Sequence, residues 1–219
     1  MSEREQIVSQ IVAEGLVAIV RVPRPELALP LAKALVTGGI RAVELTMSIP
    51  NALEAIRTVN RELGDDILLG IGTVTDDDTC RAAIDAGARY VISPINRPSL
   101  VAAAHALDRP VMLGAYTPTE AQAAHESGSD FVKIFPADTL GPSYIKALLA
   151  PLPHLRIIPT GGVNLDTMEA FLAAGSVALG VGSALLKKEL ITEENWGELE
   201  RLAKRFADKL AELKDSSGH

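Results

Sequence analysis

Cysteine is nearly absent from this 219-residue sequence, since Cys80 is the only one. A single cysteine excludes an intramolecular disulfide and any metal site built from several thiolates, so we expect the reducing cytoplasm as the compartment. Cys80 follows the third apolar run in a helical stretch with no base nearby in the pattern, and we interpret it as a packing residue. The four histidines, His105, His125, His154 and His219, show no metal-ligand spacing. We therefore expect neither a metal nor another cofactor.

Clusters of basic residues and long apolar runs are missing as well. The chain has 21 Lys and Arg against 28 Asp and Glu, which gives a net charge of −7. Such a balance argues against a surface that coats nucleic acid. No apolar run reaches the roughly 20 residues needed to cross a bilayer, and the N-terminus lacks the pattern of a signal peptide. We expect neither nucleic acid nor a membrane as a partner.

Aromatic residues make up only 4% of the chain, whereas hydrophobic residues make up 47%. The apolar content is concentrated in eight short runs rich in Val and Ile, each followed by a stretch with helical spacing and a polar turn. Nearly continuous runs of this kind are typical of strands that helices cover on both faces. The runs are Leu16–Val22, Ala42–Thr46, Ile67–Val74, Tyr90–Pro94, Pro110–Tyr116, Phe131–Pro136, Arg156–Val163 and Val177–Ser183.

Eight repeats of strand and helix predict a closed parallel barrel. The runs recur about every 20–26 residues, the length of one strand, one helix and two loops. We therefore expect residues 1–219 to form a single-domain (β/α)8 TIM barrel. An amphipathic segment with Ile7 and Ile11 ends at Gly15, and it predicts a short helix that covers the bottom of the barrel before the first strand. Thr75 and Thr192 are the expected caps of the fourth and last helices.

Functional residues of such a barrel gather where the strands end, at the C-terminal face. The candidates are therefore the residues that close each apolar run, together with Gly72 beside Thr73. They are Arg21, Glu44, Thr46, Gly72, Thr73, Pro94, Lys133, Phe135, Thr160, Gly161, Gly162, Gly182 and Ser183.

Lys133 is the most informative candidate, because it lies inside the apolar segment Phe-Val-Lys-Ile-Phe-Pro. A charged amine costs several kcal/mol to bury, and burial favours the neutral form, which can attack a ketone. Glu44 is a second charge within a buried-strand pattern, and it is a candidate general acid/base near the lysine. Two structural alternatives stay open: Lys133 reaches solvent from a strand end, or it forms a purely structural ion pair with Glu44.

Glycines close the seventh and eighth runs, in Pro159-Thr160-Gly161-Gly162-Val163 and in Gly180-Val181-Gly182-Ser183. Many barrels bind a phosphate at this position, because glycines allow exposed backbone N–H groups to approach an anion. The alternative is that the glycines only relieve crowding at the rim. Thr73 is interpreted as a hydroxyl and backbone donor for a carboxylate.

Several blocks together resemble the KDPG/KHG aldolases, the class I pyruvate aldolases of sugar-acid breakdown. The resemblance covers nearly the whole chain, and its Lys-Ile-Phe-Pro and Thr-Gly-Gly blocks are specific. The blocks are Gly38 to Thr46, Gly70 to Val74, Ile92 to Pro94, Val132 to Ala137, Pro159 to Val163, and Gly182-Ser183.

This resemblance implies a role for each matching residue. Lys133 matches the lysine that forms the Schiff base, and Glu44 matches the glutamate that shuttles protons through water. The two glycine segments match those that hold the substrate phosphate. The resemblance also implies a homotrimer that needs no metal.

One position departs from the family pattern. Some members hold the pyruvate carboxylate with an arginine two residues after the threonine of the second strand, where this chain has Ser48. Arg21 is our candidate to supply that charge, and a salt bridge at the rim is its alternative role.

We expect cleavage of 2-dehydro-3-deoxy-6-phosphogluconate to pyruvate and glyceraldehyde 3-phosphate, with 4-hydroxy-2-oxoglutarate as a further substrate. The galactonate-derived isomer remains an alternative substrate. Two other functions stay open: a phosphate-binding isomerase or decarboxylase that uses Lys133 only as a charge, and a non-catalytic trimeric scaffold.

Overall fold

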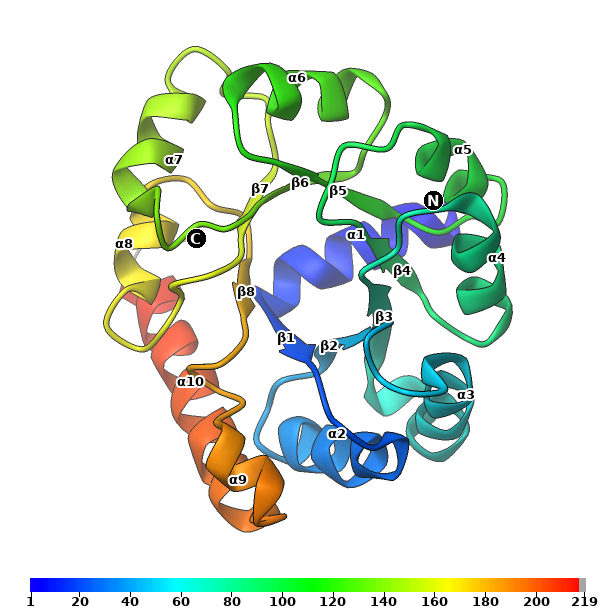
Figure 1. The fold of residues 1–219 in the computed structure, drawn as a ribbon. Helices are drawn as coiled ribbons and strands as arrows, with labels where there is room; N and C mark the ends of the chain where they lie inside the picture. The colour runs from blue at the N-terminus through cyan, green and yellow to red at the C-terminus, as the bar shows by residue number, and fades with distance from the viewer. Residues whose placement is uncertain (217–219) are drawn as a thin grey trace.

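Eight parallel strands, each followed by a helix, form the centre of the structure (Figure 1). The computed structural model describes residues 1–216. The strands are β1 (Leu16–Val20), β2 (Ala42–Thr46), β3 (Leu68–Gly72), β4 (Tyr90–Ile92), β5 (Val111–Ala115), β6 (Phe131–Ile134), β7 (Ile157–Pro159) and β8 (Leu179–Val181). The α-helices are α1 (Glu3–Glu14), α2 (Ala28–Thr37), α3 (Ala52–Leu63), α4 (Asp77–Asp85), α5 (Ser99–His105), α6 (Pro118–Glu126), α7 (Gly141–Leu149), α8 (Met168–Ala173), α9 (Lys188–Thr192) and α10 (Trp196–Ser216).

Hydrogen bonds connect the strands in the order β7-β6-β5-β4-β3-β2-β1-β8. A parallel bridge between Thr160 and Gly180 joins the remaining two edges, so the sheet closes on itself. This arrangement confirms the predicted (β/α)8 barrel. Most strands are shorter than the apolar runs that predicted them; the run Ile67–Val74, for example, contains β3. The last residues of such runs leave the sheet and build the rim, where catalytic groups of barrels are found.

Alternation along each strand divides the apolar side chains into two cores. On β1, Leu16 and Ala18 pack outward against the helices, whereas Val17 points into the barrel. A period of two is expected, because successive side chains of a strand point to opposite faces. The internal core consists of Val17, Ala42, Leu68, Tyr90, Ile92, Met112, Phe131, Ile158 and Ala178, together with Ile7, Val8 and Ile11 of α1.

Helix α1 lies across the N-terminal end of the barrel, on the far side in Figure 1. It begins with a capping box, in which the Ser2 hydroxyl accepts from the Glu5 backbone N–H and the Glu5 carboxylate accepts from the Ser2 N–H. It ends at Gly15, which adopts the left-handed conformation with φ 70°. The prediction of a short helix that covers the bottom of the barrel is confirmed.

Two helix caps differ from the expectation. Helix α4 is capped by Asp76, whose carboxylate accepts from Thr79 N at 2.8 Å, and not by Thr75. Thr192 is the last residue of α9, and its hydroxyl donates to the Lys188 carbonyl. A positive φ of 52° at Glu194 separates α9 from α10. Asn195 then caps α10, because its side-chain oxygen accepts from Glu198 N at 3.2 Å.

The residues that lack functional patterns behave as packing or surface groups. Cys80 is fully buried on α4, and burial raises the pKa of its thiol to about 11. Within residues 1–216, no group of three or more His, Cys, Asp and Glu side chains is arranged to hold a metal ion. No helix in that same range combines the length and the apolarity needed to cross a membrane. His219 lies outside the described residues.

Candidate active site

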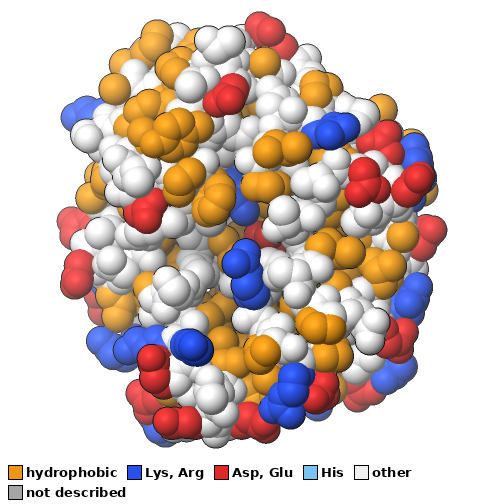
Figure 2. Space-filling view, viewed as in Figure 1, with side chains coloured by type: hydrophobic (Ala, Val, Ile, Leu, Met, Phe, Trp, Pro, Cys, Tyr) orange, Lys and Arg blue, Asp and Glu red, His pale blue; other side chains and the backbone are white. Residues whose placement is uncertain are grey.

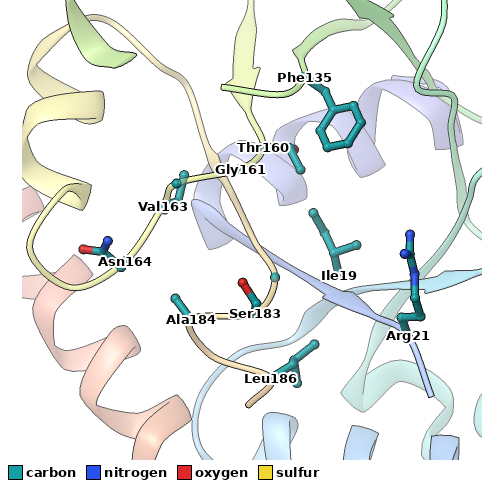
Figure 3. A pocket seen from close by; sticks show the side chains of 12 residues that line it. Ile19, Arg21, Phe135, Thr160, Gly161, Val163, Asn164, Ser183, Ala184 and Leu186 are labelled. Carbon is teal, nitrogen blue, oxygen red and sulfur yellow. The ribbon is translucent and has the colours of Figure 1, made fainter. Parts of the chain in front are cut away.

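A cavity of about 570 Å³ opens at the C-terminal end of the strands, at the centre of the face shown in Figure 2. Its volume is typical of a small-molecule site. The cavity is formed where β1, β6, β7 and β8 end (Figure 3). Seven of the residues selected from the sequence line it: Arg21, Phe135, Thr160, Gly161, Gly162, Gly182 and Ser183.

Lys133 and Glu44 face each other inside the barrel. Lys133 is on β6 and 6% exposed, and Glu44 is on β2 and 1% exposed. The Lys133 Nζ lies 3.7 Å from the Glu44 Oε2, and it also lies 5.5 Å from the centre of the Phe135 ring. This geometry excludes the alternative in which Lys133 reaches solvent from a strand end. It places a primary amine next to a carboxylate in the buried interior of the barrel.

The charge state of Glu44 is set by opposing effects. Burial raises the pKa of the Glu44 carboxyl, because water no longer solvates the anion. The nearby positive charges of Lys133 and Arg21 act in the opposite direction, and burial dominates. A carboxyl with a raised pKa accepts a proton more readily than an ordinary carboxylate, which suits a general acid/base.

Gly72 leaves the space that the Glu44 side chain occupies. A Cβ at position 72 would collide with Oε1 of Glu44, so any larger residue would displace the carboxylate. Thr46, at the end of β2, is 1% exposed and shares a 2.8 Å hydrogen bond with the Ser48 hydroxyl. Four predicted site residues do not line the cavity and lie on the β2 to β4 side of the barrel: Thr46, Gly72, Thr73 and Pro94.

Arg21 extends from the end of β1 toward the Phe135 side of the cavity (Figure 3). Among residues 1–216, no carboxylate lies within 4.0 Å of its guanidinium, so the alternative of a rim salt bridge does not hold there. Its positive charge is one of the contributions that oppose the rise of the Glu44 pKa caused by burial. An unpaired guanidinium in a cavity of this size is suited to bind a carboxylate or a phosphate.

The ends of β7 and β8 are held side by side by the bridge between Thr160 and Gly180. Gly161 and Gly162 have positive φ angles of 100° and 72°, which L side chains rarely adopt. A Cβ at Gly182 would meet no atom within 4 Å, so this backbone borders open space. Both glycine segments line the same cavity, and this arrangement can bring backbone N–H groups to an anion.

Some lining residues were not selected from the sequence. Ile19 is two residues after the inward-facing Val17, so the alternation along β1 could have identified it. Asn164 carries a turn signal, since its side-chain oxygen accepts from the backbone N–H groups of Asp166 and Thr167. Ala184 and Leu186 follow the last strand in a loop without a periodic pattern, and no sequence signal identifies them.

Known proteins resemble this chain along most of its length. The family model of the KDPG and KHG aldolases matches residues 7–202. A 2-dehydro-3-deoxy-phosphogluconate aldolase of Pseudomonas aeruginosa is 33% identical over 195 residues, which cover 89% of this chain and 88% of the relative. A probable 2-dehydro-3-deoxy-6-phosphogalactonate aldolase of Rhizobium meliloti is 36% identical over 173 residues, which cover 78% of this chain and 82% of the relative.

The fold of this chain also resembles that of a solved KDPG aldolase structure. The KDPG aldolase of Legionella pneumophila, with pyruvate captured at low pH as a covalent carbinolamine intermediate, is 30% identical and superposes with a TM-score of 0.83. The superposition covers 91% of this chain and 97% of that structure.

Proposed function

Because the chain belongs to the KDPG and KHG aldolase family and is therefore an aldolase, we propose that it cleaves 2-dehydro-3-deoxy-6-phosphogluconate through a Schiff base on Lys133. The products are pyruvate and glyceraldehyde 3-phosphate. The observation that carries this proposal is the buried pair of Lys133 and Glu44, with 3.7 Å between amine and carboxylate. The carbinolamine of pyruvate in the Legionella relative supports the same chemistry.

The first half of the mechanism forms the imine. The neutral amine of Lys133 attacks the C2 ketone of the substrate, and the resulting carbinolamine loses water to give an iminium ion. Glu44 relays the protons of this dehydration. The iminium group at C2 carries a positive charge adjacent to C3. It can therefore accept the electrons of the C3–C4 bond, a role that a metal ion supports in other aldolases.

The second half breaks the bond between C3 and C4. Glu44 removes the proton of the C4 hydroxyl through a water molecule, the C3–C4 electrons move into the iminium, and glyceraldehyde 3-phosphate leaves. The enamine on Lys133 is protonated at C3. Water then attacks the iminium, and hydrolysis releases pyruvate and restores the amine.

The two ends of the substrate are both anionic, and the site offers a partner for each. Arg21 and Thr73 bind the carboxylate next to the ketone, in place of the arginine for which this chain has Ser48. The backbone of Gly161, Gly162, Gly182 and Ser183 binds the phosphate. This assignment is supported by the position of these glycines beside the cavity and by the absence of an ion pair for Arg21 within residues 1–216. Phe135 forms a wall of the cavity, whereas Thr46, Gly72 and Pro94, the other residues predicted to contact the substrate, lie outside its lining on the β2 to β4 side.

A second candidate substrate is the galactonate-derived isomer, which differs from the first in the configuration of C4. The 36% identity to the Rhizobium meliloti aldolase favours it. The two isomers present the C4 hydroxyl in different orientations. Because Glu44 is the base that acts on this hydroxyl, the two isomers should react at different rates. Values of kcat/KM for both isomers and for 4-hydroxy-2-oxoglutarate, measured with one preparation, decide the preference.

The decisive experiment traps the imine. Incubation with pyruvate and borohydride should attach a reduced pyruvate adduct to Lys133 and abolish cleavage, with intact mass and peptide mapping as readouts. Lys133→Met is the matched control and should carry no adduct. An adduct on another lysine, or none in the wild type, would contradict the Schiff-base mechanism and favour an isomerase, a decarboxylase or a scaffold.

We also propose the setting in which the enzyme works. The whole chain acts as one domain and assembles into a homotrimer, as the family resemblance implies. It works in the cytoplasm without a metal or another cofactor, because the imine supplies the electron acceptor and the single Cys80 suits a reducing compartment.

A further inference from the structure

Tyr90 is a buried polar group that the proposed mechanism does not use. It is the first residue of β4, it is 1% exposed, and it belongs to the internal core of the barrel. Its hydroxyl has no hydrogen-bond partner among the described residues. A buried hydroxyl without a partner costs about 1–3 kcal/mol, whereas a phenylalanine would fill the same space without this cost. The hydroxyl therefore requires an explanation.

The strand register places Tyr90 on the same level as Glu44. Gly70 of β3 pairs with Glu44 on one side and with Tyr90 on the other. A Cβ at Gly70 would collide with Cε2 and Cζ of Tyr90, so the far end of the ring passes over Gly70 toward β2. The phenol is thus directed across a strand without a side chain, toward the strand that carries Glu44.

Glu44 likewise has a buried oxygen atom without a hydrogen-bond partner among the described residues. Its Oε2 is buried and makes no hydrogen bond to the described residues, although the Lys133 Nζ lies 3.7 Å away. The charged groups that influence the pKa of Glu44 are Lys133 and Arg21. Those that influence the pKa of Tyr90 are Glu44 and Glu14. Burial raises the pKa of the Tyr90 hydroxyl well above its ordinary value, and the negative charge of Glu44 acts in the same direction.

We propose that Tyr90 is a positioning residue for Glu44, whose Oε2 receives a hydrogen bond from the Tyr90 hydroxyl through one internal water molecule. This inference rests on the proposed function, in which Glu44 is the base. A buried water commonly bridges polar groups of this kind. Lys133 cannot hold the carboxylate throughout the reaction, because its amine becomes the imine nitrogen. The phenol is a neutral donor that stays in place in every step, and it keeps the carboxylate charged and oriented.

The test is the pH dependence of kcat/KM for cleavage by Tyr90→Phe. Loss of a donor to the charged form raises the pKa of Glu44, and the base is active only when ionised. The acidic limb should therefore move to higher pH by about half to one pH unit. KM at the alkaline plateau should stay unchanged, because Tyr90 lies in the internal core and not in the lining of the cavity.

A matched control is Tyr144→Phe, which removes a phenol hydroxyl outside the barrel that donates to the Tyr116 carbonyl. Its pH profile should superimpose on that of the wild type. In a Glu44→Gln background, Tyr90→Phe should have no further effect, since Tyr90 acts only through Glu44. An additional loss in that background would show that Tyr90 acts by packing and would overturn the inference.

The two proposals can fail separately. If the wild type forms no pyruvate adduct on Lys133, the proposed function fails. If the adduct forms but Tyr90→Phe keeps the wild-type profile and unfolds at a higher temperature, the hydroxyl is an unpaired group and only the Tyr90 inference fails. Circular dichroism of each variant confirms that the fold is retained.

Discussion

At the scale of the residue, the chemistry that we propose depends on two side chains that face each other inside the barrel, Lys133 and Glu44. Each would be costly to bury alone, and together they reduce that cost while keeping a carboxyl with a raised pKa beside an amine. An ion pair that served stability alone would be equally well replaced by apolar residues. The pair is therefore best explained by reaction chemistry, which substitution can test.

Glu44→Gln should retain the fold and the trapping of pyruvate at Lys133 but lose cleavage. The amide keeps the size of the carboxylate and removes the base, so kcat should fall by about 10²–10⁴-fold. In the wild type, we expect activity to be lost as the pH falls through the pKa of Glu44, which burial raises above its ordinary value of 4.5. This acidic limb should disappear in the variant, as a pH profile of kcat/KM shows.

Glu54→Gln is the control for this change, because Glu54 is an exposed carboxylate on α3 whose one ion pair among residues 1–216 is with Arg57. It should keep wild-type kinetics. If Glu44→Gln cleaves the substrate at nearly the wild-type rate, Glu44 is only the structural partner of Lys133. The proton shuttle would then lie among waters held by Thr46, Thr73 or Thr160.

Gly182→Ala should weaken phosphate binding without disturbing the protein. The added methyl meets no protein atom within 4 Å and projects from the backbone that borders the cavity. KM for the phosphorylated substrate should rise by about 10- to 100-fold, the value of a hydrogen bond to a charged group. KM for 4-hydroxy-2-oxoglutarate, which has no phosphate, should change by about twofold or less. Steady-state kinetics with both substrates give the comparison.

Gly182 is a better position for this substitution than Gly162, because the backbone conformation at Gly162 does not accept a side chain. Gly162 has φ 72°, and a Cβ there would lie 2.9 Å from Asp138 Cα, so its replacement would strain the chain whatever the ligand. Gly197→Ala, on α10 away from the cavity, is the control for a harmless glycine change. Equal losses on both substrates would show that Gly182 has a structural or catalytic role.

At the scale of the element, α1 closes the end of the barrel opposite to the cavity. Ile7 and Ile11 are fully buried and belong to the same internal core as Val17 and Tyr90. An open barrel end would expose these side chains to water. The helix therefore contributes to stability, whereas the reacting groups lie at the other end of the strands.

Ile11→Ala should lower the free energy of unfolding by about 2–5 kcal/mol, because the deletion leaves a cavity in a packed core. The value of kcat/KM for folded enzyme should be unchanged. Urea denaturation at one fixed protein concentration measures the first quantity. Val12→Ala is the control on the same helix, since Val12 is 38% exposed, and it should change stability by no more than about 0.5 kcal/mol. Equal effects of the two changes would show that α1 does not pack into the barrel.

At the scale of the whole molecule, apolar side chains remain exposed at the rim. Ile95 and Tyr116 follow β4 and β5 and are 43% and 41% exposed. Exposed apolar surface that gathers on one part of a protein is typical of an interface. Together with the homotrimer proposed above, this rim is our candidate for the contact between subunits.

The protein should have a solution mass three times the 23.2 kDa of one chain, as measured by light scattering after gel filtration. Ile95→Asp should lower this mass, because a buried unpaired carboxylate disfavours the contact. Leu107→Asp is the control: Leu107 is 38% exposed but lies in the loop that precedes β5, at the opposite end of the barrel. A mass of one chain in the wild type would contradict the trimer.

The number and order of the strands, and the two buried charged residues that we propose to react, could be predicted from the sequence alone. Both are local signals. Buried strands between helices are apolar along their whole length, and a lysine or glutamate inside such a run, as at Lys133 and Glu44, stands out without any knowledge of its neighbours. The helix caps were less predictable, because Thr75 and Asp76 are adjacent residues that can both cap a helix, and only the backbone decides which one does.

Only the tertiary structure decided which of these residues meet. The 3.7 Å between Lys133 and Glu44, the lack of an ion pair for Arg21 within residues 1–216, and the passage of Tyr90 over Gly70 all depend on strand register and barrel closure. The alternation of side chains along a strand predicts which face of the sheet each one occupies. It does not predict how far neighbouring strands are shifted relative to each other. Tyr90 looked like one more apolar core residue in the sequence, and its register opposite Gly70 is what lets its ring lie over β3.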